Sequence, residues 1–133
     1  MRIAKVNTSF SFYIKGLVFK ERPRFNTYTR AVYTPKTTKE WELEIGYLAR
    51  NAMLQKGIDK LNGAIKVTIT ATCKNIFKKP DIDNIAKIIL DALNKIAYKD
   101  DARVIELVVK KEPIDPLFSN KAQEEVVVTV EEV

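Results

Sequence analysis

The segment IKVTITATCKNIFKKPDIDNIAKIILDAL, from Ile65 to Leu93, predicts a strand followed by a helix. In the stretch Ile65–Cys73 apolar side chains alternate with lysine and threonine, which is the period of a strand buried on one side. From Ile82 to Asn94 the apolar side chains recur at helical spacing, so an amphipathic helix is expected there. Pro80 separates the two elements. The centre of the chain is therefore a strand and a helix that share one core.

Further strands are expected on both sides of this pair. Val104–Val109 follows the helix, and Ser9–Phe19 and Glu125–Val133 lie near the two ends of the chain. All three stretches are rich in β-branched or aromatic residues, which favour strands. The segments Lys20–Lys36 and Glu112–Lys121 carry proline and other turn residues and are predicted to be loops, the first with a short strand near Ala31–Thr34.

A second helix is predicted before the central strand. Thr37 and Glu40 form a capping-box pattern, and apolar residues then recur at helical spacing to about Gln55, leaving a polar outer face. Gly57 is expected to end this helix. The order of elements predicts a single domain, residues 1–133, of the α+β (mixed α/β) class, with a mixed sheet of about four strands and two helices packed on it.

Composition excludes several kinds of chemistry. The chain has no histidine and one cysteine, Cys73, so an internal disulfide, the usual zinc sites and Ser-His-Asp triads cannot form. Catalysis would have to use carboxylates, lysine, tyrosine or a hard metal ion. No Gly-rich phosphate loop occurs among the four glycines, and no small-molecule cofactor is expected. No apolar run reaches the length of a membrane span, so we expect no membrane partner and a cytoplasmic location.

Positive charge is concentrated near the N-terminus. Residues 1–36 hold eight Lys or Arg and one acid, a net of +7, whereas the other 97 residues hold fifteen basic and sixteen acidic side chains, a net of −1. Clustered positive charge of this kind indicates a polyanion as partner, with nucleic acid the leading class. A solvated loop is the alternative for the segment after the first strand. The candidate DNA-binding residues are Lys20, Arg22, Arg24, Arg30, Lys36, Lys78 and Lys79.

The candidate catalytic residues are aspartates around the second helix. Asp81 and Asp83 lie at its start, where free N–H groups and the positive end of the helix dipole favour ionised carboxylates. The helix advances about 16 Å from Asn84 to Asn94, and an extended return over Lys95–Asp101 could bring Asp100 or Asp101 back beside this pair. Spacing alone does not choose between Asp100 and Asp101.

Three carboxylates at one place require a cation. Oxygen ligands with partial hydration favour Mg²⁺, with Mn²⁺ as a substitute. Lys87 lies one turn after Asp83 and could stabilise charge on a reacting phosphate. Asp91 lies about 12 Å along the helix from Asp83, too far to share an ion, and we expect it to be structural.

The run from Lys78 to Lys111 resembles the signature of the RusA family of Holliday-junction resolvases: a basic residue, D-x-D-N, a lysine one turn later, D-A-L, then D-D and a strand. Weaker similarity extends through Arg22–Arg24 and the segment before the first helix. The resemblance implies a small homodimer of phages or prophages that cleaves four-way DNA junctions with Mg²⁺ in recombination and repair. It also implies that Asp81, Asp83 and Asp101 bind the metal, that Lys87 is catalytic, and that Asp100 is a possible auxiliary residue.

Two other functions remain open on the sequence. A general structure-selective DNase would use the same acids on flaps or forks. A non-catalytic DNA-binding protein would use the aspartates only to begin a helix. Cleavage of branched DNA in the presence of a divalent metal separates the first two functions from the third.

Overall fold

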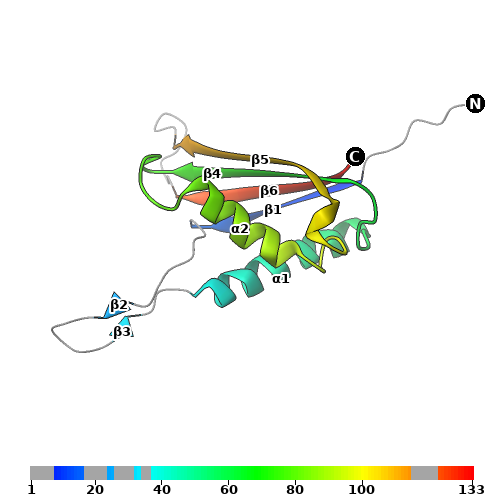
Figure 1. Ribbon diagram of the computed structural model, residues 1–133, viewed down its shortest axis with the longest axis horizontal. Helices are drawn as coiled ribbons and strands as arrows, with labels where there is room; N and C mark the ends of the chain where they lie inside the picture. Colours follow the sequence, from blue (N-terminus) through cyan, green and yellow to red (C-terminus); the bar gives the residue numbers. More distant parts are fainter. Residues whose placement is uncertain (1–7, 17–23, 26–31, 34–36, 115–122) are drawn as a thin grey trace, which may run out of the picture.

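The computed structural model describes residues 8–16, 24–25, 32–33, 37–114 and 123–133. The main sheet has the strand order β1-β6-β4-β5 and is formed by β1 (Ser9–Lys15), β4 (Ile65–Cys73), β5 (Val104–Pro113) and β6 (Glu125–Glu132). Both helices, α1 (Thr38–Lys56) and α2 (Ile82–Leu93), lie on one face of this sheet (Figure 1). The predicted α+β class with a four-stranded mixed sheet and two helices is confirmed.

The core lies between the sheet and the helices because alternate strand residues point to that side. Phe10, Phe12 and Ile14 of β1 pair with Val130, Val128 and Val126 of β6, and all six side chains are buried. Every second residue of β4, from Ile65 to Cys73, is buried on the same side. The helices close this layer with Ile45 and Ala49 of α1 and Ile85, Ile88, Ile89 and Leu93 of α2.

The strands β4 and β5 are parallel, and α2 connects them. Their register begins at Ile65 opposite Val104 and ends at Cys73 opposite Pro113. A parallel pair needs a crossover connection, and α2 with its two flanking loops supplies it. The loop before α2 therefore lies at the C-terminal end of β4, and the loop after α2 lies at the opposite end of the sheet.

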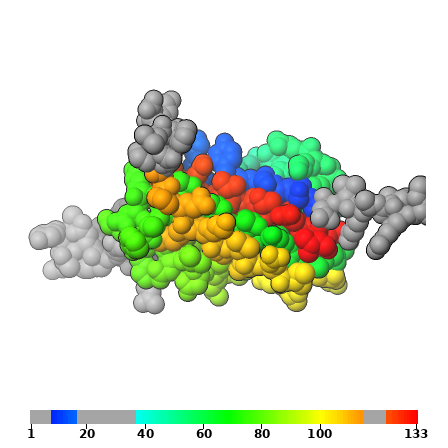
Figure 2. Space-filling model, turned by 90° about the horizontal axis from the view of Figure 1, so that it is seen from above, coloured from blue at the N-terminus to red at the C-terminus, as the bar shows by residue number. Residues whose placement is uncertain are grey.

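The other face of the sheet is covered by neither helix. Figure 2 shows the strands side by side on this face. Its residues are mostly polar, and those of the two central strands are half-buried: Thr68 and Thr70 of β4 stand beside Thr129 and Val127 of β6. A hydrogen bond joins the Ser11 and Thr129 hydroxyl groups at 2.9 Å. This polar face agrees with the alternation that the sequence shows.

The remaining predicted elements occur at the expected positions in the chain, and some of their bounds differ from the prediction. The strand β5 runs four residues beyond its predicted end at Val109. A separate hairpin joins β2 (Arg24–Phe25) and β3 (Val32–Tyr33), which confirms the short strand expected near Ala31–Thr34. Thr37 Oγ1 accepts from the Glu40 N–H at 3.1 Å, and Gly57 ends α1 with φ +65°. Neither described helix is long and apolar enough to cross a membrane.

One expectation about α1 is wrong. Its outer face was predicted to be polar, but the side chains of Leu43, Tyr47 and Leu54 are exposed there. The apolar pattern of α1 therefore exceeds what the sheet and α2 can cover.

Candidate active site

Asp81 and Asp83 lie at the N-terminal end of α2, as expected. Asp81 is the N-cap residue, but its side chain makes no capping hydrogen bond. It accepts a hydrogen bond from Lys79 Nζ at 2.9 Å, and this pair is exposed, with 57% of the Asp81 side chain and 84% of the Lys79 side chain accessible. The bond to Asp81 raises the pKa of Lys79 above its ordinary value. Asp83, in the first turn, is also exposed. Two solvent-facing carboxylates therefore stand at the positive end of a helix.

Lys87 stands one helical turn after Asp83 and is exposed on the same side of α2. Asp91 follows one turn later and is exposed as well. The apolar residues Ile85, Ile88 and Ile89 face the core and hold this polar stripe outward. The helix thus presents alternating negative, positive and negative side chains along its outer surface.

Asp100 and Asp101 lie beyond the other end of α2. Asp100 is the N-cap of the short 3-10 helix Asp101–Arg103, and its carboxylate accepts from the Ala102 N–H at 3.0 Å. Asp101 is half-buried, and burial raises its pKa. The Tyr98 hydroxyl opposes this rise, whereas the negative charges of Asp91 and Asp100 add to it.

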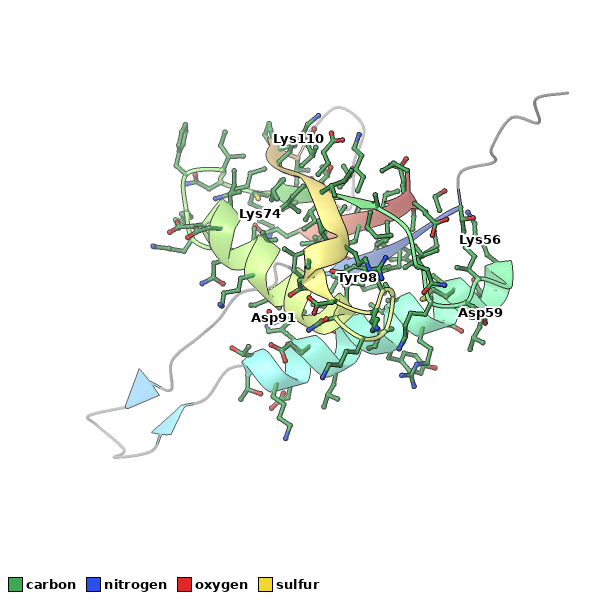
Figure 3. The ribbon with its side chains drawn as sticks, turned by 45° about the vertical axis from the view of Figure 1, so that its right-hand side comes forward. Lys56, Asp59, Lys74, Asp91, Tyr98 and Lys110 are labelled. Atoms are coloured by element: carbon green, nitrogen blue, oxygen red, sulfur yellow. The ribbon has the colours of Figure 1, made fainter. Side chains whose placement is uncertain are left out.

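Tyr98 is fully buried beside Asp101, and burial raises its pKa well above the ordinary value, with the charges of Asp101 and Asp91 adding to the rise. Tyr98 and Asp101 interact closely enough to shift each other's pKa, yet neither the Tyr98 hydroxyl nor Asp101 Oδ1 has a hydrogen-bond partner of regular geometry among the described residues. Asn94 Oδ1 is likewise buried without a hydrogen-bond partner among the described residues. Figure 3 labels Asp91 on α2 and Tyr98 in the segment that follows. No pattern in the sequence predicts that Tyr98 lies beside these acids.

The expectation that Asp100 or Asp101 lies beside Asp81 and Asp83 is not met within one chain. No group of three or more Asp, Glu or Cys residues suited to a metal ion occurs in the part of the chain that the structure describes. The reason is the segment after α2, which is compact rather than extended: Ala97 N–H donates to Leu93 O at 2.9 Å, and Lys95 N–H donates to Tyr98 O at 2.9 Å. The chain returns only along β5, after Asp101.

The strand β5 brings a further basic residue, not among the predicted site residues, to the loop before α2. Lys111, near the end of β5, donates from Nζ to the Lys78 carbonyl oxygen at 2.7 Å. It therefore stands at the loop before α2, where Lys78 and Lys79 are exposed. Lys74 and Lys110, labelled in Figure 3, lie toward the same end of the strands. Residue spacing did not predict this group because Lys74 and Lys111 are far apart in the chain.

Of the predicted N-terminal basic residues, the structure describes Arg24. Lys20, Arg22, Arg30 and Lys36 lie outside the described residues. Arg24 lies in β2, where its backbone pairs with Tyr33. The position of these residues relative to α2 therefore stays a prediction.

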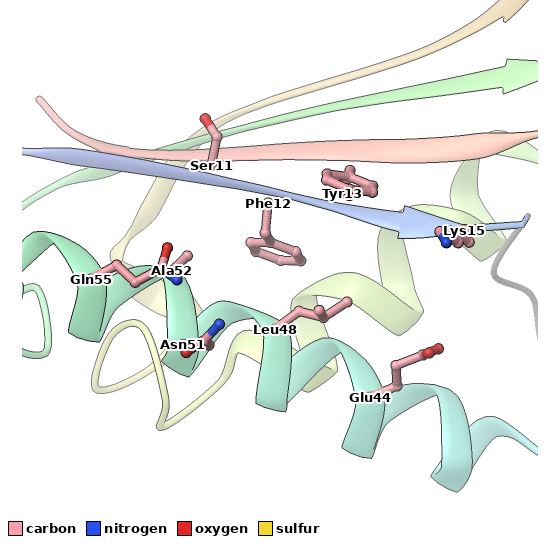
Figure 4. A pocket seen from close by; sticks show the side chains of 9 residues that line it. All are labelled: Ser11, Phe12, Tyr13, Lys15, Glu44, Leu48, Asn51, Ala52 and Gln55. Carbon is pink, nitrogen blue, oxygen red and sulfur yellow. The ribbon is translucent and has the colours of Figure 1, made fainter.

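A groove between β1 and α1 is a different feature of the surface (Figure 4). Phe12, Leu48 and Ala52 form its apolar part, and Ser11, Asn51 and Gln55 contribute polar groups. Glu44 is the one carboxylate among the described residues that line it. The groove does not offer the paired acids that phosphodiester cleavage with a metal requires.

The fit of a divalent cation differs between the two ends of α2. Mg²⁺ commonly uses one or two carboxylates and completes its shell with water and substrate phosphate. The exposed pair Asp81 and Asp83 fits that pattern, with room for water on the solvent side. At the other end, the unpaired buried Oδ1 of Asp101 lies in a negative surrounding that favours a cation. Asp81, Asp83 and Asp101 of one chain do not fit a single ion.

Comparison with known proteins gives two findings. A segment of 33 residues is 54% identical to the uncharacterized protein YqaN of Bacillus subtilis (strain 168), and the match covers 25% of this chain and 23% of that protein. The model of the family described as Endodeoxyribonuclease RusA matches residues 17–131 of the 133. That match takes in α1, α2, the sheet from β4 to β6 and every candidate aspartate. The chain therefore belongs to the RusA family of endodeoxyribonucleases.

Proposed function

We propose that this protein is a Mg²⁺-dependent endodeoxyribonuclease that resolves four-way DNA junctions by paired phosphodiester hydrolysis, with a role in recombination and repair. Membership of the RusA family supports DNA cleavage. The observation that carries the proposal is the exposed pair Asp81 and Asp83 at the start of α2, with Lys78, Lys79 and Lys111 beside it. Carboxylates for a cation and ammonium groups for phosphates thus stand at one place on the surface.

Each candidate residue has a role in this proposal. Asp81 and Asp83 bind Mg²⁺, for which Mn²⁺ can substitute, and the ion when bound supplies an activated water and polarises the phosphate. Lys87 points along the same surface of α2 and stabilises negative charge that develops on the phosphate. Asp101 binds a cation at the opposite end of α2, with Asp100 as an auxiliary residue. Metal binding requires that Asp81 leave its ion pair with Lys79. Because this pair is exposed, breaking it costs little free energy.

The partners follow from the substrate. A four-way junction has two-fold symmetry, so paired cuts are most simply made by a homodimer with two sites. The basic residues around the loop before α2, with the predicted N-terminal group, would follow the DNA backbone. Flap or fork cleavage and binding without cleavage are the two competing functions.

The test is a cleavage assay on a synthetic four-way junction. The wild-type protein is incubated with the junction in Mg²⁺, Mn²⁺ or EDTA, beside the variants Asp83→Asn, Asp101→Asn and Asp59→Asn. Asp59 is an exposed aspartate in the loop after α1 and serves as the matched control. We expect paired nicks with either metal and a fall of at least about 100-fold for Asp83→Asn, the loss typical of an essential catalytic group. Asp59→Asn should cleave like the wild type.

The competing functions give different results in the same assay. Cleavage of flaps with junctions left intact would show a structure-selective DNase. Binding without nicks under every metal condition would show a non-catalytic DNA-binding protein. Full activity of Asp101→Asn, with Asp83→Asn inactive, would remove Asp101 from the proposal and leave the Asp81 and Asp83 pair in it.

A further inference from the structure

Phe77 is the most exposed large apolar residue that the structure describes. Its exposed fraction is 92%, and the next highest is 72%, for Leu54. Phe77 lies in the loop between β4 and α2, residues 74–80, which lies at one end of the sheet in Figure 1. A side chain this exposed makes few contacts within the protein, so it adds little to the stability of the fold. The reason for a phenylalanine here has to be sought outside the chain.

Hydrogen bonds hold the backbone that carries Phe77. Its N–H donates to Asn75 Oδ1 at 3.0 Å, and the Lys78 N–H donates to the Asn75 carbonyl oxygen at 3.2 Å, which closes a tight turn. Lys111 Nζ donates to the Lys78 carbonyl oxygen at 2.7 Å. The preceding residue, Ile76, is half-buried against the core. A loop fixed in this way presents the aromatic ring of Phe77 to solvent.

The charges around this ring indicate the chemistry of its partner. Residues 74–79 contain no acid and three exposed lysines: Lys74, Lys78 and Lys79. A flat apolar ring among ammonium groups suits a partner that has both negative charges and flat faces. A nucleic acid has both, because its phosphates attract lysine and its bases stack on aromatic rings. An apolar protein surface would lack the negative charge.

The ring also lies close to the candidate catalytic acids. Phe77 precedes Asp81 by four residues, so their Cα atoms are at most about 13 Å apart. Successive base pairs of a duplex are about 3.4 Å apart along its axis. A base in contact with Phe77 therefore lies within about four base pairs of a phosphate held at Asp81 and Asp83.

Linear and branched DNA differ in what they offer to such a ring. In a linear duplex each base pair stacks on two neighbours, so a ring can enter only by unstacking a step, and this opposes binding. At a branch point the continuous stack is interrupted, and the cost of separating bases is lower where they are already unpaired or unstacked. An aromatic ring at the tip of a basic loop thus favours branched DNA.

We propose that Phe77 stacks on a base at the branch point and makes this protein prefer branched DNA to linear duplex. The inference rests on the proposed function, because it takes DNA junctions as the substrate, and it adds the residue that recognises the branch. The lysines of the loop attract the phosphates of either kind of DNA, whereas Phe77 contributes to the branched kind alone.

The first test compares binding to a labelled four-way junction and to a linear duplex with the same arm sequence, by fluorescence anisotropy in EDTA. We expect Phe77→Ala to bind the junction about 5- to 150-fold more weakly, the loss typical of one stacked base, and to bind the duplex within about twofold of wild type. Phe77→Trp, which keeps an aromatic face, should keep the wild-type preference. Circular dichroism should show these variants folded, since the substituted side chain is exposed.

The matched control is Leu54→Ala. Leu54 is also a large exposed apolar residue, but it lies near the end of α1, at the opposite end of the molecule from the loop before α2 (Figure 1). Leu54→Ala should bind both kinds of DNA like the wild type. An equal loss of junction binding in the two alanine variants would show a general effect of removing exposed apolar surface and would overturn the proposal.

The second test looks for the stacking contact itself. In Phe77→Trp the new indole is a fluorescent probe at the tip of the loop, and the native Trp41 is buried, so the wild type measures its background. Stacking on a base should quench the new indole when junction is added, and an equal concentration of linear duplex should quench it much less. Equal quenching by both kinds of DNA would contradict the recognition of a branch.

Three further results would overturn the proposal. The first is a wild type that binds junction and duplex equally well, and the second is a Phe77→Ala variant with an unchanged preference for the junction. The third is binding to anionic phospholipid vesicles that requires Phe77 while junction binding does not, which would assign the ring to a membrane surface. Failure of the nuclease proposal is seen separately, as a wild type that prefers the junction in EDTA but makes no nicks in Mg²⁺ or Mn²⁺.

Discussion

At the scale of single residues, Asp81 shows how a helix start can be used for something other than capping. An aspartate at the N-cap normally accepts from the N–H of the second or third helical residue. Asp81 has the extended backbone of an N-cap, with ψ 156°, yet its carboxylate turns to Lys79. The carboxylate of Asp81 is thus not used for capping and remains exposed at the positive end of the helix, where a cation and a phosphate could bind side by side.

Cys73 offers a prediction about reactivity. Its side chain is fully buried at the end of β4, and burial raises the pKa of its thiol above the ordinary value. Since the thiolate is the reactive form, we expect the folded protein to react with iodoacetamide at pH 8 at least about tenfold more slowly than the protein in urea. Mass spectrometry of the alkylated chain measures both rates. Equal rates would mean that the end of β4 opens readily.

At the scale of elements, the turn after α2 decides where Asp101 lies. Tyr98 anchors this turn: its ring is buried, and its carbonyl oxygen accepts from the Lys95 N–H at 2.9 Å. Lys95 takes the left-handed conformation with φ +68°, which lets the chain reverse over a few residues. A compact turn at this point keeps Asp101 at the C-terminal end of the helix.

The unpaired hydroxyl of Tyr98 leads to a prediction about stability. Tyr98→Phe removes a buried polar group that lacks a partner, so we expect an unchanged or higher melting temperature. Tyr98→Ala leaves a cavity and should lower the free energy of unfolding by about 3–5 kcal/mol. Urea unfolding curves of the two variants measure both effects. A loss of about 1 kcal/mol in Tyr98→Phe would show that the hydroxyl does bond to Asp101 in solution.

The elements themselves could be predicted because their patterns are local. The alternation from Ile65 to Cys73 defined β4 to the residue, and the apolar period after Ile82 defined α2 to within one residue. The end of β5 could not be predicted, because Lys110–Pro113 carry no strand pattern and are held by pairing with Thr70–Cys73. The exposed side of α1 was missed because counting apolar residues does not show which of them the core can reach.

At the scale of the whole molecule, the candidate site was predictable only in part. Asp81, Asp83 and Lys87 lie on one helix, so their shared surface follows from spacing. The position of Asp101 depends on β5 running parallel to β4. The number of residues between α2 and Asp101 would have allowed Asp101 to lie at either end of the helix. Lys111 reaches the loop before α2 by the same parallel pairing. Contacts that depend on which strands pair in the sheet, and in which direction, are thus the part of the site that the sequence alone does not predict.

The basic residues at the loop before α2 lead to a prediction about DNA binding. If Lys78 and Lys111 each contact one phosphate, the double variant Lys78→Ala/Lys111→Ala should flatten the slope of log Kobs against log salt concentration by about 2, because each contact releases close to one counterion. Fluorescence anisotropy with a labelled junction, in EDTA to prevent cleavage, measures this slope. The control is Lys39→Ala/Lys60→Ala, which removes two exposed lysines from other parts of the surface, the start of α1 and the loop after it. Equal slopes for the two double variants would place the DNA elsewhere, whereas a selective change would put the phosphate backbone within reach of Asp81 and Asp83.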